Sequence, residues 1–169
     1  MRRVCAHIGS AGVVVALVMA WSGAALGADM PKEGSFKFDF CFVGQAETMT
    51  VDEQRSITRY TAITNLRTEP AGGPFDRQSG RCWGILSNLS GKPKEYGYCE
   101  LIDQDKDAYY IEYHSNEAGD GGTYTAVHGA GKYAGMTLKG EYSYKLWPST
   151  SPNVIQGCNP NQGTYKLAQ

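Results

Sequence analysis

The chain alternates between hydrophobic and polar residues, with a period of two, over much of its length after residue 35. In residues 35–42 every second residue is phenylalanine, and in residues 136–147 large apolar or aromatic residues alternate with charged and small polar ones. Successive side chains of a β-strand point to opposite faces, so this pattern predicts half-buried strands rather than helices.

Similar extended segments recur to the end of the chain, separated by short stretches rich in Gly, Pro, Asn, Asp and Ser. About eight strands are predicted, at residues 35–42, 56–66, 81–87, 95–102, 107–114, 122–128, 136–147 and 163–167. Residues 148–162 are expected to form the longest loop. Many short strands with short connections are typical of antiparallel sandwiches and barrels, and closure removes exposed sheet edges. We therefore expect an all-β fold with a single closed antiparallel barrel.

Tyrosines on the more apolar strand faces are the best functional indication in the sequence. Tyr109, Tyr113, Tyr142 and Tyr144 are predicted to line the barrel interior. An eight-stranded barrel is either filled by side chains or holds one small ligand. Tyrosine combines a large apolar ring with a hydroxyl at its tip, which suits a small, mostly apolar ligand carrying a few polar groups. A filled barrel, in which these tyrosines are only core, is the alternative.

The strand at residues 136–147 gives the sharpest prediction of which face is buried. The inward face is expected to hold Leu138, Gly140, Tyr142, Tyr144 and Leu146. The outward face is expected to hold Lys139, Glu141, Ser143 and Lys145, because unpaired charge inside a barrel is costly. At Gly140 the missing side chain would leave room for a neighbouring side chain or a ligand.

Four cysteines lie beyond the N-terminal segment, and we expect two disulfides. Folding the hairpin about Ser90–Gly91 places Cys82 opposite Cys99 at nearly disulfide distance. Cys41 and Cys158 remain, near the first and last strands, and their bond would join the two ends of the fold. A zinc site is the alternative, but its cysteines normally lie two to four residues apart, and these are spread too widely.

The N-terminal residues have the layout of a secretory signal peptide. A basic start at Arg2 and Arg3 precedes an apolar run, and small residues at Ala25 and Gly27 would direct cleavage before Ala28. The run is shorter than the roughly 20 residues of a membrane-spanning helix, which makes an uncleaved anchor the weaker alternative. We expect a signal peptide at residues 1–27, one domain at 28–169, and export to the periplasm or beyond.

Composition excludes several classes of function. The formal net charge is −1, and no basic patch indicates nucleic-acid binding. No second apolar run is long enough to predict a membrane span in the mature chain. The Asp103, Asp105 and Asp107 spacing resembles part of a calcium loop, but the glycine and glutamate required later in that loop are missing, so a polar turn is favoured. No metal or cofactor is expected.

Catalytic signatures are weak. His114 and His128 are the only histidines after the N-terminal segment, and no third ligand lies at a suggestive spacing. Surface or turn positions are therefore favoured for both histidines. A two-histidine metal or acid–base site is the alternative. No nucleophile motif is present, so catalytic residues stay unassigned.

One resemblance adds to this interpretation. The stretch from Gly122 to Tyr142, with its glycine-rich turn Gly129-Ala-Gly-Lys-Tyr-Ala-Gly135, resembles bacterial exported proteins with an allene oxide cyclase barrel-like domain. Residues 81–84, 97–100 and 103–107 resemble the same group. The resemblance implies a calycin-type closed barrel with a central cavity. It transfers no catalytic residue, because glycines and aromatics specify a fold far better than an activity.

Three classes of function stay open on this basis. The first is an exported barrel that binds a small, mostly apolar ligand. The second is a cyclase or isomerase that acts on such a molecule inside the barrel, and the third is a structural or interaction module of the cell envelope with a filled barrel. An interior cavity would distinguish the first two from the third, and converging buried polar groups would favour the enzyme.

Overall fold

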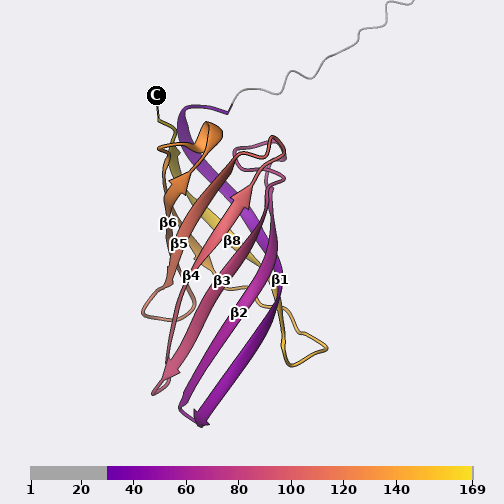
Figure 1. The fold of residues 1–169 in the computed structure, drawn as a ribbon, viewed down its shortest axis with the longest axis vertical. Coiled ribbons are helices and arrows are strands. Elements are labelled where there is room, and N and C mark those ends of the chain that lie inside the picture. The colour runs from indigo at the N-terminus through magenta and orange to yellow at the C-terminus, as the bar shows by residue number, and fades with distance from the viewer. Residues whose placement is uncertain (1–29, 169) are drawn as a thin grey trace, which may run out of the picture.

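The computed structural model describes residues 30–168 and forms a closed antiparallel barrel (Figure 1). Each strand pairs with its neighbours in the chain, and the last strand pairs back with the first. The elements are β1 (Glu33–Asp52), β2 (Arg55–Thr68), β3 (Ser79–Leu89), β4 (Lys92–Ile102), β5 (Ala108–Ser115), β6 (Gly121–Gly129), the 3-10 helix η1 (Gly131–Tyr133), β7 (Thr137–Ser143) and β8 (Val154–Lys166). The predicted all-β fold and closed barrel are confirmed.

Period-two alternation places one face of each strand inside the barrel. In β2 the side chains of Ala62, Thr64 and Leu66 are buried, while the residues between them are exposed. In β1 the phenylalanine face turns inward as predicted, with Phe36 and Phe38 buried. A shift of one residue in register would expose all of these rings, so burial fixes the register.

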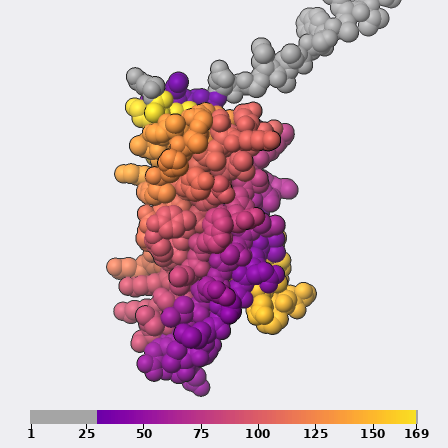
Figure 2. Space-filling view, viewed as in Figure 1, coloured from indigo at the N-terminus to yellow at the C-terminus, as the bar shows by residue number. Residues whose placement is uncertain are grey.

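The end of the chain differs from its prediction. Strand β7 ends at Ser143, and β8 begins at Val154, so most of the expected loop at 148–162 is strand. The glycine and proline of this segment misled the prediction. Pro160 lies just outside the regular ladder between β7 and β8, which starts at Asn161, so its missing N–H disrupts no pairing there. The remaining connection projects from the wall beside β1 (Figure 1, Figure 2).

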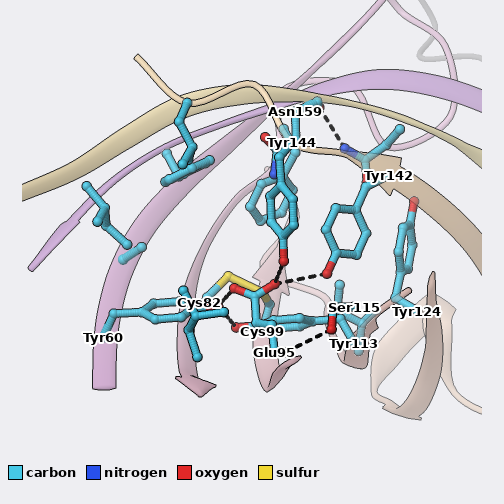
Figure 3. Close-up of a pocket in the computed structure, with 18 of the residues that line it drawn as sticks. Tyr60, Cys82, Glu95, Cys99, Tyr113, Ser115, Tyr124, Tyr142, Tyr144 and Asn159 are labelled. Atoms are coloured by element: carbon cyan, nitrogen blue, oxygen red, sulfur yellow. Dashed lines mark hydrogen bonds between the residues drawn. A yellow bond between two sulfur atoms is a disulfide. The ribbon is translucent and has the colours of Figure 1, made fainter. Parts of the chain in front are cut away.

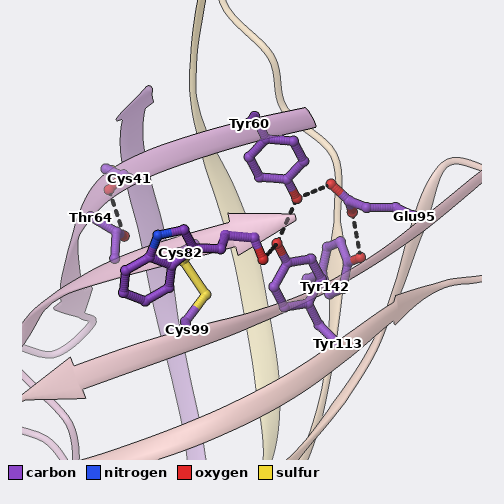
Figure 4. Close-up of a disulfide and its surroundings, with 9 residues drawn as sticks. Cys41, Tyr60, Thr64, Cys82, Glu95, Cys99, Tyr113 and Tyr142 are labelled. Carbon is purple, nitrogen blue, oxygen red and sulfur yellow. Dashed lines mark hydrogen bonds between the residues drawn. A yellow bond between two sulfur atoms is a disulfide. The ribbon is translucent and has the colours of Figure 1, made fainter. Parts of the chain in front are cut away.

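Both predicted cysteine pairs form disulfides, and both join directly opposed residues of neighbouring strands. Cys82–Cys99 links β3 to β4 on the inner wall (Figure 4). Cys41–Cys158 links β1 to β8 across the seam that closes the barrel, and its two cysteines have a sequence separation of 117. A loop of that length lowers the entropy of the unfolded chain enough to stabilise by roughly 4 kcal/mol.

The start of β1 and the end of β8 lie at the same end of the barrel (Figure 1). Side chains from outside the strands fill this end. Phe75, from the connection between β2 and β3, is 3% exposed, and Tyr133 from η1 is 1% exposed. The Phe75 ring packs against five other rings, those of Phe36, Phe38, Tyr109, Tyr133 and Tyr165. We call this the closed end.

The predicted signal peptide and its cleavage before Ala28 lie outside the described residues. Across residues 30–168, no helix is long and apolar enough to span a membrane.

Candidate functional site

A cavity of about 370 Å³ occupies the half of the barrel away from the closed end. All eight strands contribute to its lining, which is mostly aromatic and aliphatic. Its size falls within the range of small-molecule sites. Leu146, at its rim, is 65% exposed, so the cavity lining reaches the protein surface at this residue.

The four tyrosines predicted to line the interior all border this cavity. Tyr113, Tyr142 and Tyr144 surround its polar part. Tyr109 is set apart, because its hydroxyl donates to Gln78 at 2.8 Å and its ring packs against Phe75, so it forms the floor beside the closed end.

Glu95 is the centre of the polar part, and sequence reasoning missed it. Its carboxylate accepts hydrogen bonds from the hydroxyls of Tyr60, Tyr142 and Tyr144 (Figure 3). The Tyr142 hydroxyl lies 3.0 Å from Oε2. The backbone N–H of Glu95 donates to Ser115 Oγ at 2.8 Å, which fixes β4 against β5 at this point. Strand β4 thus places a carboxylate where tyrosines from β2 and from the β7 side converge.

A fourth tyrosine extends the cluster. The hydroxyls of Tyr60 and Tyr113 lie 2.6 Å apart (Figure 4). Because the single hydroxyl proton of Tyr60 is directed to Glu95, Tyr60 is the acceptor in this pair, and the Tyr113 hydroxyl has a second acceptor in the Trp83 carbonyl oxygen at 3.3 Å. The two hydroxyls lie against Gly84 and Gly97, which face each other across β3 and β4. A Cβ at either glycine would collide with them, so the glycines make the space for this contact.

The electrostatics of the cluster keep its tyrosines neutral. Burial raises the pKa of Tyr60, Tyr142 and Tyr144 well above the ordinary value for tyrosine, and the negative charge of Glu95 raises it further. Glu95 is the one charged side chain among the described residues that line the cavity, and no lysine, arginine or histidine of residues 30–168 lines it. The cavity therefore carries a negative charge without a positive partner in its lining.

Most side chains of residues 136–147 point to the predicted side of the barrel wall. Leu138 is buried, and Tyr142 and Tyr144 point into the cavity, while Lys139, Glu141, Ser143 and Lys145 are exposed. The prediction for Leu146 is wrong: β7 has already ended, and this side chain lies exposed at the rim.

Gly140 leaves room for a neighbouring side chain. The Tyr124 ring lies directly against its α-carbon, where a Cβ would collide. The Tyr124 hydroxyl points away from Glu95 (Figure 3) and has no hydrogen-bond partner among residues 30–168.

The other candidate residues lie away from the cavity. Asp103 and Asp105 both pair with the Lys132 ammonium, at 2.7 and 2.8 Å, and Asp103 Oδ1 also accepts from backbone N–H groups of its own turn. The aspartates thus form a polar turn held by a lysine. Within residues 30–168, no group of three or more His, Cys, Asp or Glu side chains is arranged to hold a metal.

His114 and His128 are exposed on the outer wall and are not brought together. His114 pairs with Thr123 and His128 with Tyr110, four residues apart along β5.

Fold and cavity together define a small closed barrel with a ligand-sized, mostly apolar interior that contains one carboxylate–tyrosine cluster. Neither a scan against protein-family models nor a search of curated proteins finds a match to this chain.

Proposed function

We propose that this protein binds one small, mostly apolar molecule inside its barrel. The observation that carries the proposal is the cavity of about 370 Å³, bordered by apolar and aromatic side chains, with a lining that reaches the protein surface at Leu146. An apolar molecule that displaces water from such a lining gains hydrophobic free energy, and the few polar groups orient it. Empty space of this size favours the ligand-binding hypothesis over a filled structural module.

The proposal includes export from the cell. The basic start, apolar run and small residues before Ala28 support a cleaved signal peptide, and two disulfides suit an oxidising compartment. N-terminal sequencing of protein from its own host is expected to begin at Ala28. A mature chain that still begins at Met1 would contradict export by this route.

Native mass spectrometry of the protein from its host tests binding directly. One small molecule per chain is expected, lost on denaturation. A neutral probe such as 1-octanol, followed by calorimetry, tests the cavity without knowledge of the natural ligand. Ala62→Leu narrows the cavity and is expected to weaken octanol binding about 10-fold or more, since one or two extra methylenes in a pocket have effects of that order.

The matched control is the neighbouring residue on the outer wall. Thr61→Leu enlarges an exposed side chain at the adjacent position and is expected to leave octanol binding unchanged. Equal effects of the two substitutions would place the probe outside the barrel.

A second candidate function is a cyclase or isomerase reaction, in line with the resemblance to allene oxide cyclase barrel-like proteins. One observation favours it: the Glu95 carboxylate and three hydroxyls converge inside the cavity, where a carboxylate can act as a general base. The test is to incubate the molecule identified by mass spectrometry with catalytic amounts of protein. Conversion that is lost in Glu95→Gln supports the enzyme, and an unchanged molecule supports binding alone.

A further inference from the structure

The phenol protons of the four tyrosines around Glu95 all have acceptors within the protein. Tyr60, Tyr142 and Tyr144 each donate to the carboxylate, and Tyr113 has the Tyr60 oxygen and the Trp83 carbonyl oxygen as acceptors. A phenol has one proton to donate but can still accept. The cluster therefore presents acceptor lone pairs to a ligand and has no hydroxyl proton left for it.

The carboxylate also has room for another donor. A carboxylate has about four acceptor positions, and three are occupied by hydroxyls. Oε1 accepts from Tyr60 alone, whereas Oε2 accepts from both Tyr142 and Tyr144. Since no cationic residue of the described chain lines the cavity, a positively charged donor would meet an unopposed negative charge. A ligand carboxylate would instead be repelled.

The tyrosine rings of the cluster also favour a positively charged ligand group. Tyr142 lies between Tyr113 and Tyr144, in edge-to-face arrangements with centroid separations of 6.4 and 5.4 Å. The faces of aromatic rings carry partial negative charge and attract cations, more strongly where water is excluded. Carboxylate, acceptor-only hydroxyls and ring faces thus all favour the same ligand group.

We propose that the cavity takes an organic amine in its ammonium form, with the nitrogen at the Glu95–tyrosine cluster and an apolar body among the remaining lining. This inference rests on the proposed ligand-binding function and specifies the chemical class of the ligand. The apolar body would lie against Phe38, Phe40 and Ile111, which line the rest of the cavity.

Three probes with the same eight-carbon chain test the inference: octylamine, 1-octanol and octanoate, titrated by calorimetry at pH 7. Octylamine is expected to bind at least about 10-fold more tightly than octanol, since charge-assisted hydrogen bonds are roughly twice as strong as neutral ones, and octanoate is expected to bind most weakly. Glu95→Gln should reduce octylamine affinity at least about 10-fold and remove most of the preference for octylamine over octanol.

Glu112→Gln is the matched control. Glu112 lies on the outer wall and accepts from the Tyr98 hydroxyl at 3.0 Å, so this change removes a tyrosine-bonded carboxylate outside the cavity. Octylamine binding should not change.

Each outcome has a distinct meaning. Equal affinities for octylamine and octanol, or a preference for octanoate, would overturn the amine inference and leave ligand binding intact. Failure of all three probes to bind would instead contradict the proposed function. The comparison on the unaltered protein tests the inference even if Glu95→Gln does not fold.

Discussion

The two ends of the barrel are built from the same alternating strands but have different interiors. At the closed end, Phe75 and Tyr133 enter from connecting segments and fill the space between the strands. At the other end Tyr144 is the one aromatic side chain from a connection of the described barrel that borders the interior, and about 370 Å³ stays empty. Segments outside the strands therefore decide whether a barrel of this size is core or cavity.

The polar side chains inside the barrel also differ between the two ends. At the closed end, buried Gln78 accepts from Tyr109 at 2.8 Å and donates to Tyr133 at 2.7 Å, which satisfies a neutral amide within a packed core. At the cavity end the central group is the Glu95 carboxylate, held by hydroxyls alone. An amide with its partners can be buried at little cost, whereas an ionised group needs water or a counter-charge. The first arrangement suits structure and the second suits ligand recognition.

The largest expected effect tests whether Phe75 closes the barrel. Phe75→Ala should lower the free energy of unfolding by about 3–5 kcal/mol, because it removes a fully packed ring. Phe42→Ala, at the cavity, should cost less than about 1.5 kcal/mol, because that ring is only half-buried and borders empty space. Urea unfolding measures both, and equal losses would remove the distinction between the two ends.

A smaller loss of stability is expected from substitutions on the two faces of β7. Tyr142→Ala should cost about 2–3 kcal/mol, because the half-buried ring packs against Tyr113 and Tyr144 and its hydroxyl binds Glu95. Ser143→Ala, on the exposed face, should change stability by less than about 0.5 kcal/mol. Denaturant midpoints that shift equally, or in the reverse order, would show that the inward face is wrongly assigned.

The smallest change in stability is expected from Asp76, which lies in the segment that carries Phe75. Backbone N–H donation from Thr68 to Asp76 lowers the pKa of this carboxyl; burial opposes the shift, and donation from Gly72 reinforces it. Because the folded pKa is depressed, this stabilisation is present above the unfolded value of 3.8 and is lost as pH falls through the folded pKa.

Asp76→Asn should therefore lower the free energy of unfolding at pH 7 by about 1–2 kcal/mol. The asparagine NH₂ group is a donor, and it would face one of the two backbone N–H groups that now donate to the carboxylate. The substitution should also reduce the loss of stability below about pH 4, measured by urea unfolding between pH 3 and 7. Asp39→Asn, on the exposed face of β1, is the control and should do neither. An Asp76→Asn protein with unchanged acid sensitivity would show that this carboxyl does not hold the segment.

The strands could be read from the sequence because their signal is local. Alternation gave the inward face of residues 35–42, and the hairpin at Gly91 placed Cys82 opposite Cys99. The same logic could have found Glu95, which lies four residues before Cys99 and therefore on the same face of β4. It was missed because charge is expected to face water, and only tyrosines from distant strands make its inward position tolerable.

The sequence by itself determined the all-β class, the alternation of faces, the cysteine pairing and the set of tyrosines available to the interior. Most of these follow from backbone geometry and from residues close together in the chain, and the Cys41–Cys158 pair follows once Cys82 is paired with Cys99. Tertiary structure alone decided that Phe75 and Tyr133 fill one end, that β8 continues through Pro160, and that three tyrosines meet Glu95 at the other end while a fourth meets Tyr60. Such contacts join residues tens of positions apart, and they depend on closure of the barrel, which no local pattern encodes.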